Sequence, residues 1–100
     1  MVRSLLIVES WPASEDVTAD YDRWSIETHI PEMLRITGFQ SARRGQSDTG
    51  SVVTVYEIGV AVDIAKANLR KAVEAGLISP PVALQTEPPP EMRYVTLDGE

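Results

Sequence analysis

The chain has 100 residues, of which 43% are hydrophobic and 24% are charged, as in a small globular protein with a single domain spanning residues 1–100. Fifteen acidic residues against nine basic ones give a net charge of −6, so we expect no nucleic-acid partner, because a phosphate backbone requires clustered basic residues. The lack of cysteine excludes a disulfide framework and a catalytic thiolate, and a single histidine leaves no ligand set for a metal site.

The first predicted element is a strand from Ser4 to Ser10, because the apolar run in SLLIVES is typical of a strand buried on both faces. The apolar stretch from Met1 to Val8 is too short to span a membrane and lacks a signal-peptide cleavage site. We therefore expect a cytoplasmic protein with no membrane partner. After a polar loop, amphipathic spacing predicts a helix from about Val17 to His29.

Tyr21, Trp24 and Thr28 share one face of this predicted helix, and we expect that face to point inward. Pro31 disfavours helical geometry in the residue before it and suits the first position of a new turn. We therefore expect the helix to end near His29, with a bend there and a short second turn after it.

Two strands joined by a tight turn are predicted next. They run from Phe39 to Gly45 and from Ser51 to Ile58, and the sequence QSDTG between them has the composition of a hairpin turn. In strict alternation, Arg43 shares the face of Phe39, and Arg44 points to the other face.

Helical spacing returns from Val62 to Ala75. The segment from Leu77 to Glu91 holds five of the seven prolines, so we expect an extended arm or lid and not an interior strand. A last strand is predicted from Met92 to Leu97. The order strand, helix, strand, strand, helix, strand predicts an α+β, ferredoxin-like βαββαβ fold with a four-stranded antiparallel sheet.

Several of these residues together resemble a known family. The pattern consists of Trp24, the run HIPEML that begins at His29, the Gly-Phe pair ending at Phe39 and the run ARR ending at Arg44. It resembles the first helix and second strand of the dimeric α/β-barrel superfamily, especially its small EthD-like members. The resemblance implies that the ferredoxin-like domain pairs into a homodimeric α/β barrel. It also implies a cofactor-independent enzyme of the monooxygenase, isomerase or cyclase type, acting on an aromatic or polyketide-like compound without a metal.

The apolar pattern of the strands independently favours a homodimer. Leu5, Ile7, Val53 and Val55 alternate with the residues expected to face the helices, so they need a cover on the other face of the sheet. We expect the sheet of a second copy to supply that cover.

His29 is the first candidate for chemistry, as a general acid or base, because an imidazole changes charge near neutral pH. The alternative is a structural role, in which His29 bonds a carbonyl freed at the helix end. Tyr21 and Trp24 are candidates for an aromatic wall beside a flat ligand, with packing in the core as the alternative. Small residues, Ser25 and Gly45, stand where the resembled family carries bulkier ones, so they would leave room for a ligand.

Arg43 and Arg44 point to opposite faces of their predicted strand, so only one can serve a given pocket, and we take Arg43 as the candidate for binding an anionic group of the substrate. A salt bridge to Glu57 or to the partner subunit is the alternative. Tyr56 is a candidate for supplying a phenol to the cavity, or else packs in the core. Asp22 and the neighbouring acids are expected on a solvated helix face.

Two functions therefore remain open from the sequence. The first is the small-molecule enzyme implied by the resemblance, with His29 as its catalytic residue. The second is a non-catalytic dimeric binding or accessory protein, in which His29 and the aromatic residues only pack or hold a ligand. A closed and dry pocket would favour the second.

Overall fold

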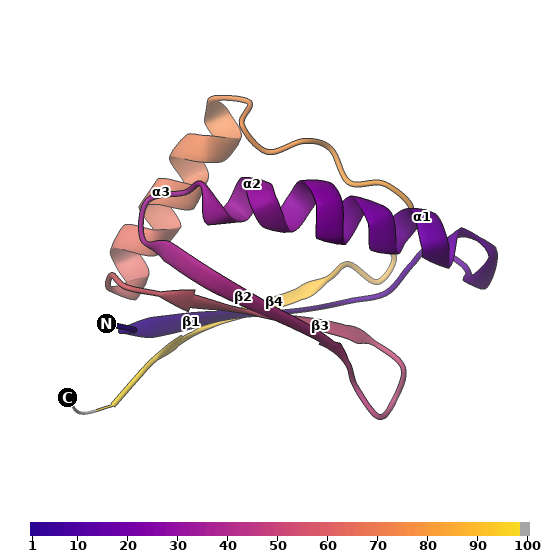
Figure 1. Ribbon diagram of the computed structural model, residues 1–100, viewed down its shortest axis with the longest axis horizontal. Helices are drawn as coiled ribbons and strands as arrows, with labels where there is room; N and C mark the ends of the chain where they lie inside the picture. Colours follow the sequence, from indigo (N-terminus) through magenta and orange to yellow (C-terminus); the bar gives the residue numbers. More distant parts are fainter. Residues whose placement is uncertain (99–100) are drawn as a thin grey trace.

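Residues 1–98 are described by the computed structural model of the protein, in which helices cover one face of a four-stranded antiparallel sheet (Figure 1). Along the sheet the strands follow the order β2-β3-β1-β4. The strands are β1 (Ser4–Ser10), β2 (Phe39–Gln46), β3 (Val52–Ile58) and β4 (Glu91–Thr96), and the helical segments are η1 (Glu15–Val17), α1 (Thr18–Arg23), η2 (Trp24–His29), α2 (Ile30–Leu34) and α3 (Val62–Glu74). This order confirms the predicted ferredoxin-like fold.

β1 is a central strand, because it pairs with β3 on one side and with β4 on the other, and its predicted bounds are confirmed. Alternate residues of the central strands face the helices, where Leu6 and Ile58 have no exposed surface and Tyr56 is buried beside them. The core consists of Leu6, Met33, Ile36, Phe39, Tyr56, Ile58, Ala65 and Ala72.

The first long helix does not end at His29, and the prediction that it would was wrong. The helical backbone continues from Thr18 to Leu34, with η2 in the π-helical form and Ile30 donating its N–H to the carbonyl of Ser25, five residues back. Pro31 lies in the first turn of α2. The wider π-helical turn relieves the contact between a proline ring and the carbonyl of the preceding turn, so the helix passes the proline.

β2 contains an irregularity that reverses the predicted direction of its arginines. Phe39 pairs with Ile58 and Ser41 pairs with Glu57, so the register shifts by one residue between Phe39 and Ser41. After this bulge, Arg44 lies on the helix-covered face with Phe39, and Arg43 lies on the opposite face. The two arginines do point to opposite faces, but strict alternation from Phe39 assigned each of them to the wrong face.

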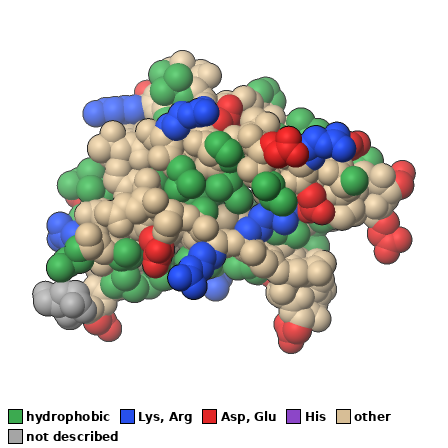
Figure 2. All heavy atoms as spheres, viewed as in Figure 1, with side chains coloured by type: hydrophobic (Ala, Val, Ile, Leu, Met, Phe, Trp, Pro, Cys, Tyr) green, Lys and Arg blue, Asp and Glu red, His purple; other side chains and the backbone are tan. Residues whose placement is uncertain are grey.

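The face of the sheet away from the helices carries Leu5, Ile7, Val53 and Val55, all partly exposed. Glu57 lies on this face and accepts a hydrogen bond from the Ser41 hydroxyl at 2.6 Å. This bond takes the place of the salt bridge between Glu57 and an arginine that was the alternative interpretation. On the side seen in Figure 2, acidic side chains gather where α1 begins, which fits the net charge of −6. No helix within residues 1–98 is long and apolar enough to cross a membrane.

Residues 77–90 form a strap that leaves α3, runs along the helix from α1 to α2 and then turns down to β4 (Figure 1). The strap is tied to the segment after β1 by two backbone hydrogen bonds. Ala13 donates its N–H to the carbonyl of Ala83 at 2.7 Å, and Gln85 donates to the carbonyl of Trp11 at 2.9 Å. The proline-rich segment is therefore a loop packed over its own helices.

Candidate functional site

A cavity of about 280 Å³ lies between the helices, the inner face of the sheet and the strap, and apolar side chains dominate its lining. A volume of this size holds a small organic molecule. The strands contribute Val8, Ser10, Thr54, Tyr56 and Met92, the helices contribute Tyr21, Trp24, Ser25, His29, Met33, Leu69 and Val73, and the strap contributes Ile78, Ser79, Pro81, Leu84 and Pro90.

The structure brings together five of the six predicted site residues, namely Tyr21, Trp24, Ser25, His29 and Tyr56, all of which line this cavity. Arg43 does not join them, because the bulge in β2 turns it to the uncovered face of the sheet. Gly45 lies near the hairpin end of β2 and lines other hollows, so it makes no room in this cavity. Whether the five residues bind a substrate stays a prediction.

The π-helical turn is what brings Trp24 and His29 together. In a regular α-helix, residues five apart point about 140° away from each other around the axis. A π-helix instead bonds residues five apart, and in η2 the two rings stack with their centroids 4.7 Å apart and their planes 25° apart. Tyr21 continues the aromatic wall, with its ring centroid 6.1 Å from that of Trp24.

Two ring nitrogens in this wall are buried and have no hydrogen-bond partner among residues 1–98, Nε1 of Trp24 and Nδ1 of His29. A buried polar atom without a partner is uncommon and calls for an explanation. Burial lowers the pKa of His29 below its ordinary value of 6.5, and the nearby Glu32 carboxylate opposes that shift. The imidazole is therefore neutral at pH 7, and one of its nitrogens is free to accept a proton.

The structural alternative for His29 required a bond from its ring to a carbonyl at the end of the helix. The helix does not end there, and Nδ1 of the imidazole has no hydrogen-bond partner in the described part of the chain. The imidazole ring instead stacks on Trp24.

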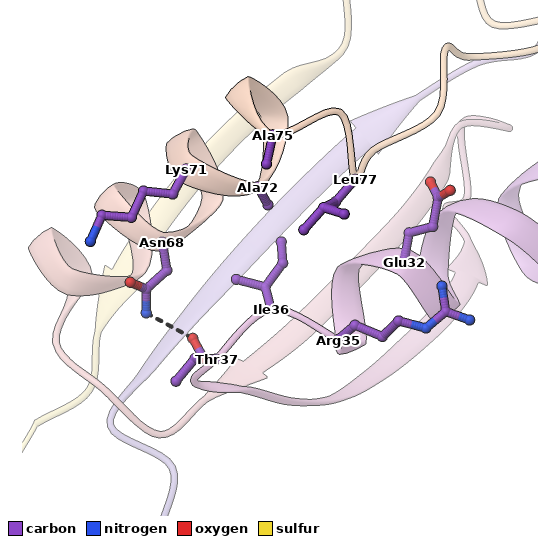
Figure 3. Close-up of a pocket in the computed structure, with 9 residues that line it drawn as sticks. All are labelled: Glu32, Arg35, Ile36, Thr37, Asn68, Lys71, Ala72, Ala75 and Leu77. Carbon is purple, nitrogen blue, oxygen red and sulfur yellow. Dashed lines mark hydrogen bonds between the residues drawn. The ribbon is translucent and has the colours of Figure 1, made fainter.

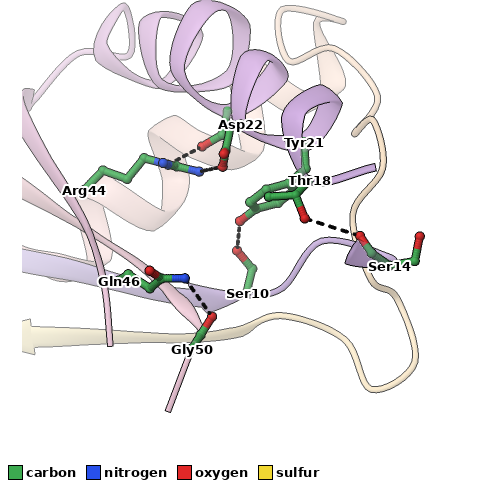
Figure 4. A network of polar contacts seen from close by, with 9 residues as sticks. Ser10, Ser14, Thr18, Tyr21, Asp22, Arg44, Gln46 and Gly50 are labelled. Carbon is green, nitrogen blue, oxygen red and sulfur yellow. Dashed lines mark hydrogen bonds and ion pairs between the residues drawn. The ribbon is translucent and has the colours of Figure 1, made fainter. Parts of the chain in front are cut away.

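A network of polar contacts beside the cavity joins the first long helix to β1 and β2 (Figure 4). The Tyr21 and Ser10 hydroxyls are 2.5 Å apart, and Arg44 donates from Nε to the Ser25 hydroxyl at 3.1 Å and from Nη2 to the Asp22 carboxylate at 2.6 Å. The guanidinium also lies 5.7 Å from the centre of the Tyr21 ring. Asp22 therefore has a partner on β2, while its side chain stays 42% exposed, in agreement with the expected solvated face.

The Tyr56 phenol in the cavity stays uncharged. Burial, and to a smaller extent the neighbouring Tyr21, raise the pKa of Tyr56 above its ordinary range, so its phenol keeps its proton at neutral pH. With His29 neutral and Arg44 engaged by Asp22, no unpaired charge among residues 1–98 faces the cavity. This interior suits an uncharged ligand.

A second hollow lies between α2 and α3, with Ile36, Ala72 and Leu77 around it (Figure 3). Its two cationic side chains do not converge, since Lys71 extends away from the groove on one side and Arg35 lies toward Glu32 on the other. Within residues 1–98, no three His, Cys, Asp or Glu residues gather closely enough to hold a metal ion.

The neutral His29 makes stability depend on pH in a defined direction. Because its pKa is lowered in the folded protein, the unfolded chain takes up this proton first as the pH falls below 6.5. We expect the free energy of unfolding to decrease from about pH 6.5 downward, with a contribution of at most about 1.4 kcal/mol per pH unit from this group. Urea unfolding across this range should show the decrease in the native chain, and His29→Gln should lack that contribution.

Neither a known protein family nor a curated protein sequence matches this chain. Among solved structures, the chain is similar to a monooxygenase from the gene ActVA-Orf6 of Streptomyces coelicolor in complex with the ligand Nanaomycin D. The TM-score is 0.58 at 19% sequence identity, and the match covers 99% of this chain and 90% of the other. At this identity the likeness shows a shared fold over nearly the whole length of both chains.

Proposed function

We propose that this chain is a small-molecule-binding protein of the dimeric α/β-barrel superfamily, of the EthD-like type, and that its cavity takes an aromatic or polyketide-like compound. The observation that carries the proposal is an apolar cavity of about 280 Å³ lined by Trp24 and His29, two residues that each carry a buried ring nitrogen without a partner among residues 1–98. A ligand with polar atoms on the edge of a flat apolar body would satisfy both nitrogens. The complex of the similar monooxygenase with Nanaomycin D supports this ligand class.

In this proposal the protein is a cofactor-independent enzyme of the monooxygenase, isomerase or cyclase type, and His29 starts its chemistry. The Trp24 N–H donates to an oxygen of the ligand, since an indole nitrogen is a donor only. The neutral His29 imidazole accepts a proton from an acidic O–H or activated C–H group of the ligand. The electron pair left on the ligand is delocalised toward the oxygen that Trp24 holds, so the proton and the charge are both accounted for.

A non-catalytic binding protein is the second candidate, and one observation favours it. A catalytic histidine is commonly oriented by a third group, and the described residues contribute no hydrogen bond to Nδ1 of His29. If the ring is held only by stacking on Trp24, the cavity binds its ligand without moving a proton.

Two similar probes test the hydrogen bond from Trp24. The variant Trp24→Phe keeps an aromatic ring and removes the N–H, so we expect it to weaken binding of 2-naphthol by on the order of tenfold. Naphthalene has no oxygen, and its affinity should change little. Calorimetric titration of both probes measures the difference, and an equal loss for the two would show that the ring matters and the N–H does not.

We also propose that the chain is a cytoplasmic homodimer in which the uncovered faces of two sheets pack together. Leu5, Ile7, Val53 and Val55 are the apolar part of that face, and its burial favours association. Sedimentation at micromolar concentration should show a dimer, and Val55→Glu should shift it toward monomer by placing charges at the centre of the interface. A stable, well-folded monomer of the native chain would refute the proposal.

A further inference from the structure

The first part of the strap, residues 77–82, lies between two residues with left-handed backbone. Gly76 has a φ of 74° where α3 ends, and Ala83 has a φ of 57° where the strap is tied to the segment after β1. Residues at such positions are able to absorb changes in backbone direction. Between them, Ile78, Ser79 and Pro81 line the cavity, so this stretch is a part of its wall.

One carboxylate latches this stretch to the helix. Glu32 on α2 accepts a hydrogen bond from the Ser79 backbone N–H at 2.9 Å through Oε1 and from the Ser79 hydroxyl at 2.5 Å through Oε2. Hydrogen bonds to an ionised acceptor are the stronger ones. These bonds hold the pKa of Glu32 below its ordinary value of 4.5, so the latch is charged at neutral pH.

The edge of the cavity beside this stretch is apolar and exposed. Val73 on α3 and Met92 on β4 both line the cavity, and their exposed fractions are 56% and 53%. Val82, in the stretch itself, is 48% exposed. Displacement of residues 77–82 would widen the cavity at this edge. It would break the two bonds of the Glu32 latch and, if Leu77 also moves, the 3.0 Å bond from the Leu77 N–H to the Ala72 carbonyl.

We propose that residues 77–82 are a lid over the ligand cavity and that Glu32 is the positioning residue that keeps it shut through Ser79. This inference rests on the proposed function only for the identity of what passes the lid. A latch that acts equally in the free and the bound protein sets how often the lid opens, and so changes the rates of ligand entry and exit by the same factor. A residue that merely supports the cavity wall changes the exit rate and the affinity instead.

The Ser79 amide tests the lid without any ligand, because its N–H is itself one of the latch bonds. In Glu32→Ala, we expect amide hydrogen exchange of Ser79 to accelerate by on the order of tenfold or more, with the Leu6 amide in the central strand unchanged. Glu27→Ala removes an exposed carboxylate from the same helix and serves as the matched control. Unchanged Ser79 exchange in Glu32→Ala, or equal acceleration in Glu27→Ala, would overturn the proposal.

Stopped-flow binding of 2-naphthol tests the function of the lid. Glu32→Ala should raise the association and dissociation rates together, each by on the order of tenfold, and leave the dissociation constant within about twofold. Ser79→Ala removes one of the two latch bonds and should give a smaller change of the same kind. A rise in the dissociation rate alone, or no change in either rate, counts against gating. If 2-naphthol does not bind the native chain, the proposed function fails, and the exchange of the Ser79 amide still decides whether the lid exists.

Discussion

Replacement of Val73 by tryptophan should close the mouth of the cavity and weaken the binding of 2-naphthol by on the order of a hundredfold. Val73 lines the cavity and is 56% exposed. A larger side chain at this position can therefore extend into solvent or across the mouth of the cavity without displacing the core. A hundredfold loss is about 2.7 kcal/mol, which corresponds to roughly 110 Å² of apolar ligand surface left uncovered at about 25 cal/mol per Å².

The control for this variant is Ile64→Trp. Ile64 is on the same helix at 48% exposure and does not line the cavity, so its replacement adds the same bulk elsewhere. Fluorescence titration should give native affinity for Ile64→Trp and a large loss for Val73→Trp, with similar melting temperatures for the two. Equal affinities in both variants would mean that the probe does not enter beside Val73.

Replacement of His29 by glutamine should slow proton exchange at carbon 1 of 2-naphthol by on the order of a hundredfold or more. In this exchange the ring carbon takes up a deuteron from solvent and then gives up its proton, and neither step needs a cofactor. Glutamine keeps a polar side chain of similar reach but cannot accept the proton at neutral pH. NMR of the ligand in D₂O with native chain or variant measures the rate.

The same variant separates catalysis from binding. If His29 is the base, the affinity for 2-naphthol and the melting temperature should remain near native while the exchange rate falls. If His29 only holds the ligand, the variant should weaken binding, and the native chain should not accelerate exchange in the first place. Unchanged exchange together with a lowered melting temperature would assign His29 to packing.

The fold was predictable from the sequence because its strands carry strong local signals. SLLIVES combines a continuous apolar run with polar ends, and β1 occupies the predicted residues Ser4–Ser10. The order strand, helix, strand, strand, helix, strand then favours the ferredoxin-like arrangement, in which both helices cover one face of the sheet. The positions of Tyr21 and Trp24 followed from helical periodicity, since that face of the helix had to meet the sheet, whereas His29 was a candidate because of its chemistry.

Two local departures from regular structure account for what the sequence did not reveal. The π-helical turn over Trp24–His29 lets the helix pass Pro31 and stacks two rings that a regular helix would separate. The bulge after Phe39 exchanges the directions of Arg43 and Arg44. Each inserts a shift of one residue, and a shift of one residue leaves no signal in the composition of the segment.

The strap shows a different kind of gap between sequence and structure. Its prolines predicted an extended segment that could not be an interior strand, and only isolated bonds join it to its surroundings. The role of Glu32 could not be predicted, because its partner Ser79 is 47 residues away along the chain. Long-range contacts between polar side chains leave no periodicity to detect.

The claim that the cavity beside His29 binds a small uncharged aromatic compound is tested most directly by NMR titration. The chain has one histidine, so its ring signals are unambiguous, and the indole N–H of Trp24 is assigned by its loss in Trp24→Phe. On addition of 2-naphthol, the His29 ring and Trp24 N–H signals should shift and saturate with a single dissociation constant, the N–H moving downfield as it gains an acceptor. The opposite result would be that the His29 and Trp24 signals do not shift while signals of other residues shift and saturate. That result would contradict binding in this cavity.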